Sequence, residues 1–356
     1  MNSATEKPTE ESDSPSLSIV TASFNSRPWI DLSWQCTKAL NAKSDFEWLV
    51  IQNTPEVSRE KDISTDDDRF RVFEGPHSTP EESQNVGWGS FHHAKALSVG
   101  YWQAKADVVL VTDPDFFILY PDWISHAIQH IQEKELAFWG APYSPNRLRA
   151  YRNFPMASCM FINRKLLHEN YFFNMDFSPD CDGQKKSTSA QSVIRSNRVL
   201  KCLKHKLLGR KTVWAENCSH IIVEYLLNKF RHLGVDTEGD TGCKIYREFH
   251  NKIASDCLEI DSRVRMSNFE KFIDFFLPNS SRLQPRSDLH PQLIQNSFFY
   301  RYRNILDEYF FEDKLYGIHV GATSYCNKSH LRKTFTEEIL PPFFESSLHE
   351  TVEFSA

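Results

Sequence analysis

Short apolar runs alternate with helical patterns in the first third of the chain, and this alternation restricts the possible folds more than any other feature. The runs LSIVTASFN (17–25), FEWLVIQN (46–53) and VVLVT (108–112) have the length and the β-branched residues typical of buried strands. Between them, apolar residues recur at helical spacing over residues 28–40 and 91–101. This order predicts an α/β fold with a mostly parallel central sheet flanked by helices.

Composition indicates the size of the core and excludes several classes of protein. The chain has 356 residues, of which 40% are hydrophobic, so a large packed domain is expected. Its net charge of −6 lacks the positive balance that is typical of proteins that bind nucleic acids, so no nucleic-acid partner is expected. No run reaches the roughly 18 apolar residues that a transmembrane helix needs. The 8 cysteines include no C-x-x-C pair, so a structural zinc site is not expected. They are dispersed along the chain, which favours reduced thiols in a cytoplasmic protein.

Three regions are predicted along the chain. Residues 1–15 are polar and rich in Ser, Thr, Glu and Pro, which is typical of a disordered leader without a signal peptide. Residues 16–180 are expected to form the core, and residues 181–356 a mainly helical region that completes the domain. Further strands are expected at 136–142, 158–167 and 315–325, and an amphipathic helix at 217–234.

The strand at 108–112 runs into two aspartates, Asp113 and Asp115, separated by Pro114. In an extended chain, residues two apart point to the same side, so the two carboxylates are expected to face one ligand. They repel each other unless one is protonated or a cation lies between them. A divalent ion such as Mg²⁺ or Mn²⁺ that also holds diphosphate oxygens would resolve this repulsion. The alternative is a simple strand-to-helix turn in which Asp115 or Asp122 caps the next helix.

The segment around these aspartates resembles the core of GT-A glycosyltransferases of the family 2 type. In that family, a helix with an Ala-Leu-Asn-x-Gly-like pattern precedes a hydrophobic strand that ends in a D-x-D motif. The pattern here runs from Ala96 to Gly100, with Ser98 where Asn is common, and leads to the strand and Asp113-Pro114-Asp115. The runs SIVTASFN and FEWLVIQN are similar to the first two strands of the family. The resemblance covers about residues 16–120 and implies the GT-A fold and a nucleotide-sugar donor.

The resemblance also implies a set of donor-binding residues. Thr21, Ser23 and Asn25 would hold the nucleotide, together with Gln52 or Asn53 from the second strand; turn chemistry is the alternative explanation for such residues. On the helix before the D-x-D motif, Lys95 and one of His92 and His93 could reach the donor, although surface helices commonly carry such residues.

Metal binding and catalysis are implied for a second set. Asp113 and Asp115 would bind Mn²⁺ or Mg²⁺, with Asp113 also near the ribose and diphosphate. His319 would be a further ligand of the metal or diphosphate, or otherwise a hydrogen-bonded core residue. Glu238 and Asp240 are the candidates for the general base of an inverting transfer, and the alternative for Asp240 is a helix N-cap.

The acceptor is expected to be a glycan, a lipid-linked molecule or another compound with a free hydroxyl. Residues 183–215 lack acidic residues, and the basic side chains of 185–211 could form a lid, an anionic-acceptor site, a peripheral membrane contact or a solvated helix face. Two other functions stay open: a nucleotidyltransferase, and a non-catalytic protein that binds carbohydrate or nucleotide on the same fold. The segment SFNSRPW lacks the glycine-rich phosphate loop expected of the nucleotidyltransferase.

Overall fold

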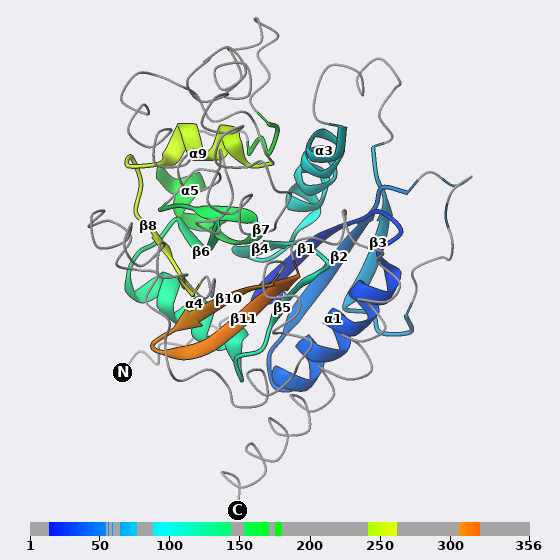
Figure 1. Cartoon of the computed structure of the whole chain (residues 1–356), viewed down its shortest axis with the longest axis horizontal. Coiled ribbons are helices and arrows are strands. Elements are labelled where there is room, and N and C mark those ends of the chain that lie inside the picture. The colour runs from blue at the N-terminus through cyan, green and yellow to red at the C-terminus, as the bar shows by residue number, and fades with distance from the viewer. Residues whose placement is uncertain are drawn as a thin grey trace, which may run out of the picture.

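The central sheet has seven strands in the order β3-β2-β1-β4-β7-β6-β8 (Figure 1). The structure, a computed structural model, describes residues 14–54, 56, 59, 65–76, 88–143, 153–170, 175–179, 241–261 and 306–320. The strands are β1 (Leu17–Ser23), β2 (Phe46–Gln52), β3 (Phe70–Glu74), β4 (Val108–Thr112), β6 (Phe138–Pro142), β7 (Pro155–Asn163) and β8 (Ser255–Cys257). All neighbours are parallel except that β7 is antiparallel to both β4 and β6. The predicted, mostly parallel sheet is confirmed.

Helices cover both faces of this sheet. They are α1 (Arg27–Leu40), α3 (Trp88–Gln103), α4 (Trp123–Glu133), α5 (Arg164–Asn170) and α9 (Cys243–Phe249). α1 and α4 lie on one side of the sheet, and α3, α5 and α9 lie on the other (Figure 1). The predicted α/β class, with helices flanking the sheet, is therefore confirmed. None of the helices in the described part of the chain is long and apolar enough to cross a membrane.

A second sheet of four antiparallel strands joins the first at the end of β4. Its order is β5 (Phe116–Ile118), β11 (Lys314–Val320), β10 (Leu306–Phe311) and β9 (Glu259–Asp261). Within 181–356, the described residues thus form α9 and four strands, and strands from this region enter both sheets. The rest of that region, including the predicted helix at 217–234 and the basic segment 185–211, lies outside the described residues.

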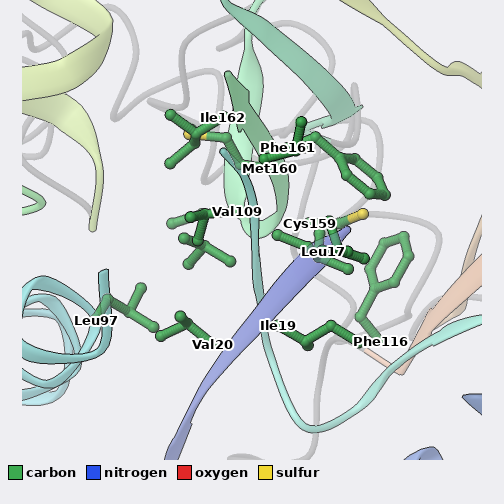
Figure 2. Close-up of a cluster of buried hydrophobic side chains, with 14 of the residues drawn as sticks. Leu17, Ile19, Val20, Leu97, Val109, Phe116, Cys159, Met160, Phe161 and Ile162 are labelled. Atoms are coloured by element: carbon green, nitrogen blue, oxygen red, sulfur yellow. The ribbon is translucent and has the colours of Figure 1, made fainter. Parts of the chain in front are cut away.

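The core between α3 and the sheet requires the glycine of the Ala96–Gly100 pattern. All seven residues of β1 are buried, with Val20 directed toward Leu97 of α3 and Ile19 toward Phe116 (Figure 2). A Cβ atom at Gly100 would lie 2.3 Å from Val20 Cγ1. The absence of a side chain at Gly100 therefore lets α3 approach β1 closely enough to cover it.

The strand predicted at 158–167 is wrong in its second half. β7 ends at Asn163 and α5 begins at Arg164. The side chain of Asn163 explains the change, because its Oδ1 accepts a hydrogen bond from Leu166 N at 3.0 Å. Asn is a favoured N-cap, and this hydrogen bond satisfies one of the unpaired amides of the first turn.

The alternative in which Asp115 caps the helix after the D-x-D motif is wrong, whereas Asp122 does occupy the N-cap position of α4. β5 follows Asp115, so no helix begins there. Asp122 precedes α4 in the left-handed region, but its side chain makes no capping hydrogen bond. Asn41, at the end of α1, provides the acceptor instead, since its Oδ1 lies 3.0 Å from Ile124 N.

Candidate functional site

The D-x-D motif forms a tight turn between the two sheets. Phe116 N donates a hydrogen bond to Asp113 O at 3.1 Å, which closes a four-residue turn with Pro114 at its second position. The extended geometry expected from sequence is therefore wrong for this segment. Proline has the backbone φ angle that this turn position requires, so the motif ends β4 and starts β5.

Pairing between β5 and β11 brings a distant histidine to this turn. His319 lies opposite Phe116 in the antiparallel register, and Val320 N donates a hydrogen bond to Asp115 O at 3.0 Å. Gly317 allows the close approach of the two strands, because a Cβ atom there would lie 2.7 Å from Phe117 O. Strand pairing thus places His319 beside residues about 200 positions earlier in the chain.

Asp113, Asp115 and His319 form a cluster that could hold a metal ion. One ligand atom from each lies within 4.8 Å of the other two. His319 Nε2 is 3.5 Å from Asp115 Oδ1 and 3.8 Å from Asp113 Oδ2. The His319 side chain is almost fully buried, with 4% of its surface exposed, so the imidazole is committed to this cluster rather than to solvent.

The donor set fits a divalent metal. Two ligand atoms that share an ion at about 2.1 Å can lie up to about 4.2 Å apart, and both distances from His319 are shorter than this. The carboxylates supply the oxygen ligands that Mg²⁺ and Mn²⁺ accept, and the imidazole adds a nitrogen suited to a transition metal. A cation would also offset the repulsion between two largely buried carboxylates.

A second imidazole, from α3, contacts the same aspartate. His93 Nε2 lies 3.0 Å from Asp113 Oδ1. Burial raises the pKa of Asp113, but the charge and hydrogen bond of His93, aided by His319 and Ser158, outweigh it and hold the pKa well below its usual range. Asp113 is therefore ionised throughout the neutral pH range.

The other ring nitrogen of His93 contacts a residue from the far end of the chain. His93 Nδ1 lies 3.3 Å from Thr241 Oγ1, and this hydroxyl also donates a hydrogen bond to Ser90 O at 3.1 Å. Sequence reasoning considered His93 only as a possible donor contact and did not identify Thr241 at all. The pairing joins residues 148 positions apart, for which no local pattern exists.

The residues predicted to bind the nucleotide lie where β1 and β2 end. The Ser23 hydroxyl is buried and has no hydrogen-bond partner among the described residues. Asn25 adopts a φ of 48° just after β1, and its backbone N–H donates to Thr54 Oγ1 at 2.8 Å. Gln52 holds this loop as well, since its Oε1 accepts from Thr54 N at 3.2 Å. These contacts shape a loop at the carboxyl end of the sheet, where ligands bind in α/β folds.

Other members of the predicted donor set hold the scaffold together. Thr21 is fully buried, and its Oγ1 accepts a hydrogen bond from Trp48 Nε1 at 3.1 Å. Asn53 Nδ2 donates to His92 O at 2.9 Å and so ties β2 to the start of α3. The Lys95 Nζ lies 4.9 Å from the centroid of the Phe91 ring, one helical turn away.

The two candidates for the general base, Glu238 and Asp240, lie outside the described residues. Helix α9 begins at Cys243, and Gly242 occupies its N-cap position in the left-handed region. The alternative role of Asp240 as a helix cap lies outside the described residues as well. Thr241, the residue that follows Asp240 in the sequence, makes the contact with His93 described above.

Phe24 is a feature of this edge that sequence reasoning missed. Its side chain follows β1 directly and remains 49% exposed, whereas all seven strand residues before it are buried. A Phe between Ser23 and Asn25, at the end of an apolar run, is the sequence signal that could have indicated an exposed aromatic ring at this edge.

The chain was compared with known proteins. No protein-family model and no curated protein matches it. Among solved structures, it is similar to the mannosyltransferase PcManGT from Pyrobaculum calidifontis in complex with GDP-Man and Mn²⁺. The identity is 12%, the TM-score 0.31, and the match covers 44% of this chain and 47% of that one.

Two further solved structures show similar values. The galactosyltransferase LgtC, in complex with donor and acceptor sugar analogs, has 15% identity and a TM-score of 0.32, with coverage of 43% of this chain and 60% of LgtC. Residues 1–349 of TarS from S. aureus have 13% identity and a TM-score of 0.31, and the match covers 81% of this chain and 87% of that one.

This chain spans less than two thirds of PcManGT and of LgtC. Glycosyltransferases, the class that the sequence resembles, are thus among the solved structures to which it is similar. Because the TM-scores are near 0.3, the activity proposed below rests on the chain's own side chains.

Proposed function

We propose that the protein is a glycosyltransferase that moves a sugar from a nucleotide-sugar donor to an acceptor hydroxyl. The observation that carries the proposal is the cluster of Asp113, Asp115 and His319 at the carboxyl end of β4 in a mostly parallel sheet. A nucleoside diphosphate leaving group needs a counter-charge at this position, and two ionised carboxylates provide none by themselves.

Three side chains would hold a divalent metal: Asp113 through Oδ2, Asp115 through Oδ1 and His319 through Nε2. When bound, the metal would supply positive charge to the diphosphate as the bond to the sugar breaks. His319 and Asp115 are buried and the Asp113 side chain is partly exposed, so the donor would approach the cluster from the side of Asp113. We assign the cluster to Mn²⁺ or Mg²⁺.

The nucleoside would bind at the loop after β1. Ser23, Asn25 and the end of β2 line this edge, and the exposed ring of Phe24 offers a face on which a base can stack. Replacing Phe24 by Ala is expected to weaken nucleoside diphosphate binding about five- to 150-fold, as the loss of about 1–3 kcal/mol of stacking implies. Phe24→Tyr keeps the ring and serves as the matched control.

The acceptor hydroxyl would lose its proton to a carboxylate, and Asp240 or Glu238 is the proposed base of an inverting transfer. The support is the position of Thr241, next in the sequence, whose hydroxyl contacts His93 of the same site. Glycans and lipid-linked molecules with a free hydroxyl are the proposed acceptors.

Calorimetric titration with UDP or GDP, with and without Mn²⁺, tests the binding step. We expect one of these nucleotides to bind in the presence of Mn²⁺ and to lose that dependence in Asp115→Asn. The control is Asp122→Asn, which makes the same chemical change at an exposed residue whose side chain makes no capping hydrogen bond. Absence of heat with every nucleoside diphosphate would refute the proposal.

Donor hydrolysis across a panel of nucleotide sugars tests the chemistry. We expect one donor to be hydrolysed by the intact chain and by Asp122→Asn but not by Asp115→Asn. Binding of a nucleoside diphosphate and Mn²⁺ with no hydrolysis or transfer of any donor would favour the alternative of a non-catalytic protein on this fold.

A further inference from the structure

His93 links the Asp-Asp-His cluster to Thr241, just before α9, through its two ring nitrogens. It lies near the beginning of α3, and the turn into β4 places that end of the helix at the carboxyl edge of the sheet (Figure 1). Its Nε2 contacts Asp113 and its Nδ1 contacts Thr241. The contact with Asp113 affects how the carboxylate of Asp113 is oriented.

The two carboxylate oxygens of Asp113 have different partners. Oδ1 lies 3.0 Å from His93 Nε2, whereas Oδ2 lies 3.8 Å from His319 Nε2, inside the cluster. Asp113 is ionised and its oxygens cannot donate, so the contact with His93 Nε2 is favourable only when that nitrogen carries a proton. With Oδ1 engaged in this way, the plane of the carboxylate is set and Oδ2 is directed toward the metal position.

The His93 ring is itself held in place. Thr241 is 4% exposed, and its hydroxyl lies within hydrogen-bond distance of both His93 Nδ1 and Ser90 O. Contacts at both nitrogens prevent the imidazole from rotating away from Asp113. The main-chain N–H of Asp113 is held as well, by a hydrogen bond to Ser158 O at 3.0 Å. With the backbone fixed in this way, the direction of the carboxylate depends on its side-chain contacts, from His93 and also from Ser158.

We propose that His93 is a positioning residue that orients Asp113 as a one-oxygen metal ligand. The proposal rests on the metal site of the proposed function, but it concerns metal affinity and does not require any transfer reaction. Residues that hydrogen-bond to metal ligands typically account for about 10- to 100-fold in metal affinity. We expect an effect of that size for His93.

Two polar substitutions separate the roles of the two nitrogens. The amide nitrogen of Gln reaches the position of the imidazole Nε2, whereas the shorter Asn reaches only that of Nδ1. His93→Gln should therefore keep an N–H group facing Asp113 Oδ1, and His93→Asn should lose it. His126→Leu, which removes an exposed imidazole from α4, serves as the control.

The measurement is the affinity of the full-length protein for Mn²⁺ alone, followed by the paramagnetic resonance of free Mn²⁺. We expect His93→Gln to lie within about threefold of the unmodified protein and His93→Asn to bind about 10- to 100-fold more weakly. The thermal midpoint of the metal-free proteins shows whether folding is preserved. A role in folding alone would lower that midpoint without separating Asn from Gln.

Equal Mn²⁺ affinity for the Asn and Gln variants, both folded, would overturn the proposal. If either variant fails to fold, Thr241→Val provides the second test, because it removes the contact at Nδ1 while leaving His93 and Asp113 intact. Its Mn²⁺ affinity should fall, and an unchanged affinity would overturn the proposal. Failure of the transferase proposal is distinguishable, since it would appear as absent donor hydrolysis with Mn²⁺ binding still dependent on His93.

Discussion

Gly100 of α3 is packed directly against Val20 of β1, at a distance that leaves no room for a side chain. A Cβ atom at position 100 would lie 2.3 Å from Val20 Cγ1 and 3.1 Å from Ile51 Cγ1. Because α3 also carries His93, this contact determines how near His93 lies to the end of the sheet. Its effect on stability can be measured.

Gly100→Ala should destabilise the protein by about 1–3 kcal/mol, since overpacking outweighs the gain of about 1 kcal/mol in helix propensity. Urea denaturation measures the change. The double variant Gly100→Ala with Val20→Ala should lose less free energy than the sum of the single variants, because the smaller residue at position 20 relieves the clash. Simple additivity would contradict the packing described for this pair.

Mn²⁺ should raise the thermal midpoint of the protein. A ligand that binds only the folded state at about 100 times its dissociation constant adds about 2.7 kcal/mol of stability. Differential scanning fluorimetry should show a rise of several degrees that a chelator reverses. Asp115→Asn should lose most of this rise and Asp122→Asn should keep it. A rise of equal size in both variants would mean that Mn²⁺ binds elsewhere.

Gly317→Ala should weaken Mn²⁺ binding from a distance of two residues. Its Cβ atom would meet Phe117 O at 2.7 Å, so β11 has to move away from β5 and carries His319 with it. We expect the Mn²⁺ affinity to fall about tenfold, which is typical when the residues that hold a metal ligand in place are disturbed. The free energy of unfolding should fall by about 1–3 kcal/mol.

Tyr316→Phe is the matched control on the same strand. The Tyr316 hydroxyl is buried and has no hydrogen-bond partner among the described residues, so its removal should leave stability unchanged or raise it by about 1 kcal/mol. Mn²⁺ affinity should not change. Weaker Mn²⁺ binding in this control would show that the site responds to any change in β11.

Alkaline pH should destabilise the protein through Tyr101. Burial raises the pKa of Tyr101 to about 12, an effect that the nearby Arg164 partly offsets. The unfolded state releases the Tyr101 proton near pH 10. The contribution of Tyr101 to the free energy of unfolding is therefore complete below pH 10 and is lost as the pH rises toward 12. The loss amounts to about 2–3 kcal/mol at an order-of-magnitude level.

Urea denaturation at several values between pH 9.5 and 11.5 tests this expectation. Tyr101→Phe lacks the ionisable hydroxyl and should lose less stability across this range than the unmodified protein. Tyr316, whose pKa is also raised by burial, contributes equally to both proteins. Parallel pH curves for the two proteins would contradict the assignment to Tyr101.

Features encoded by neighbouring residues could be predicted from the sequence. The strands β1, β2 and β4 are continuous apolar runs, and α3 has a clear helical period, so the class of fold followed from local pattern. Asp113 and Asp115 could be identified for the same reason, because they directly follow β4. The expectation of an extended segment was wrong because Pro114 favours the second position of a turn, and the turn leads into a strand rather than a helix.

Features that depend on pairing between distant segments could not be predicted. The contact of His93 with Thr241 and the placement of His319 against Asp115 both require strands and loops that are remote in sequence to meet. His319 was proposed as a ligand only through the family resemblance. Asn163 is a favoured N-cap residue and could have been recognised from the sequence, but the predicted strand at 158–167 continued past it.

The pairing of β5 with β11 also has a consequence for how the protein matures. The aspartate ligands and His319 are about 200 residues apart, and at about 5–20 residues per second a ribosome takes on the order of 10–40 s to make the part between them. During that interval the two carboxylates exist without His319. Complete Mn²⁺ binding at the proposed site is therefore expected late in biogenesis, and a nascent chain stalled before β11 should bind Mn²⁺ more weakly than the released protein.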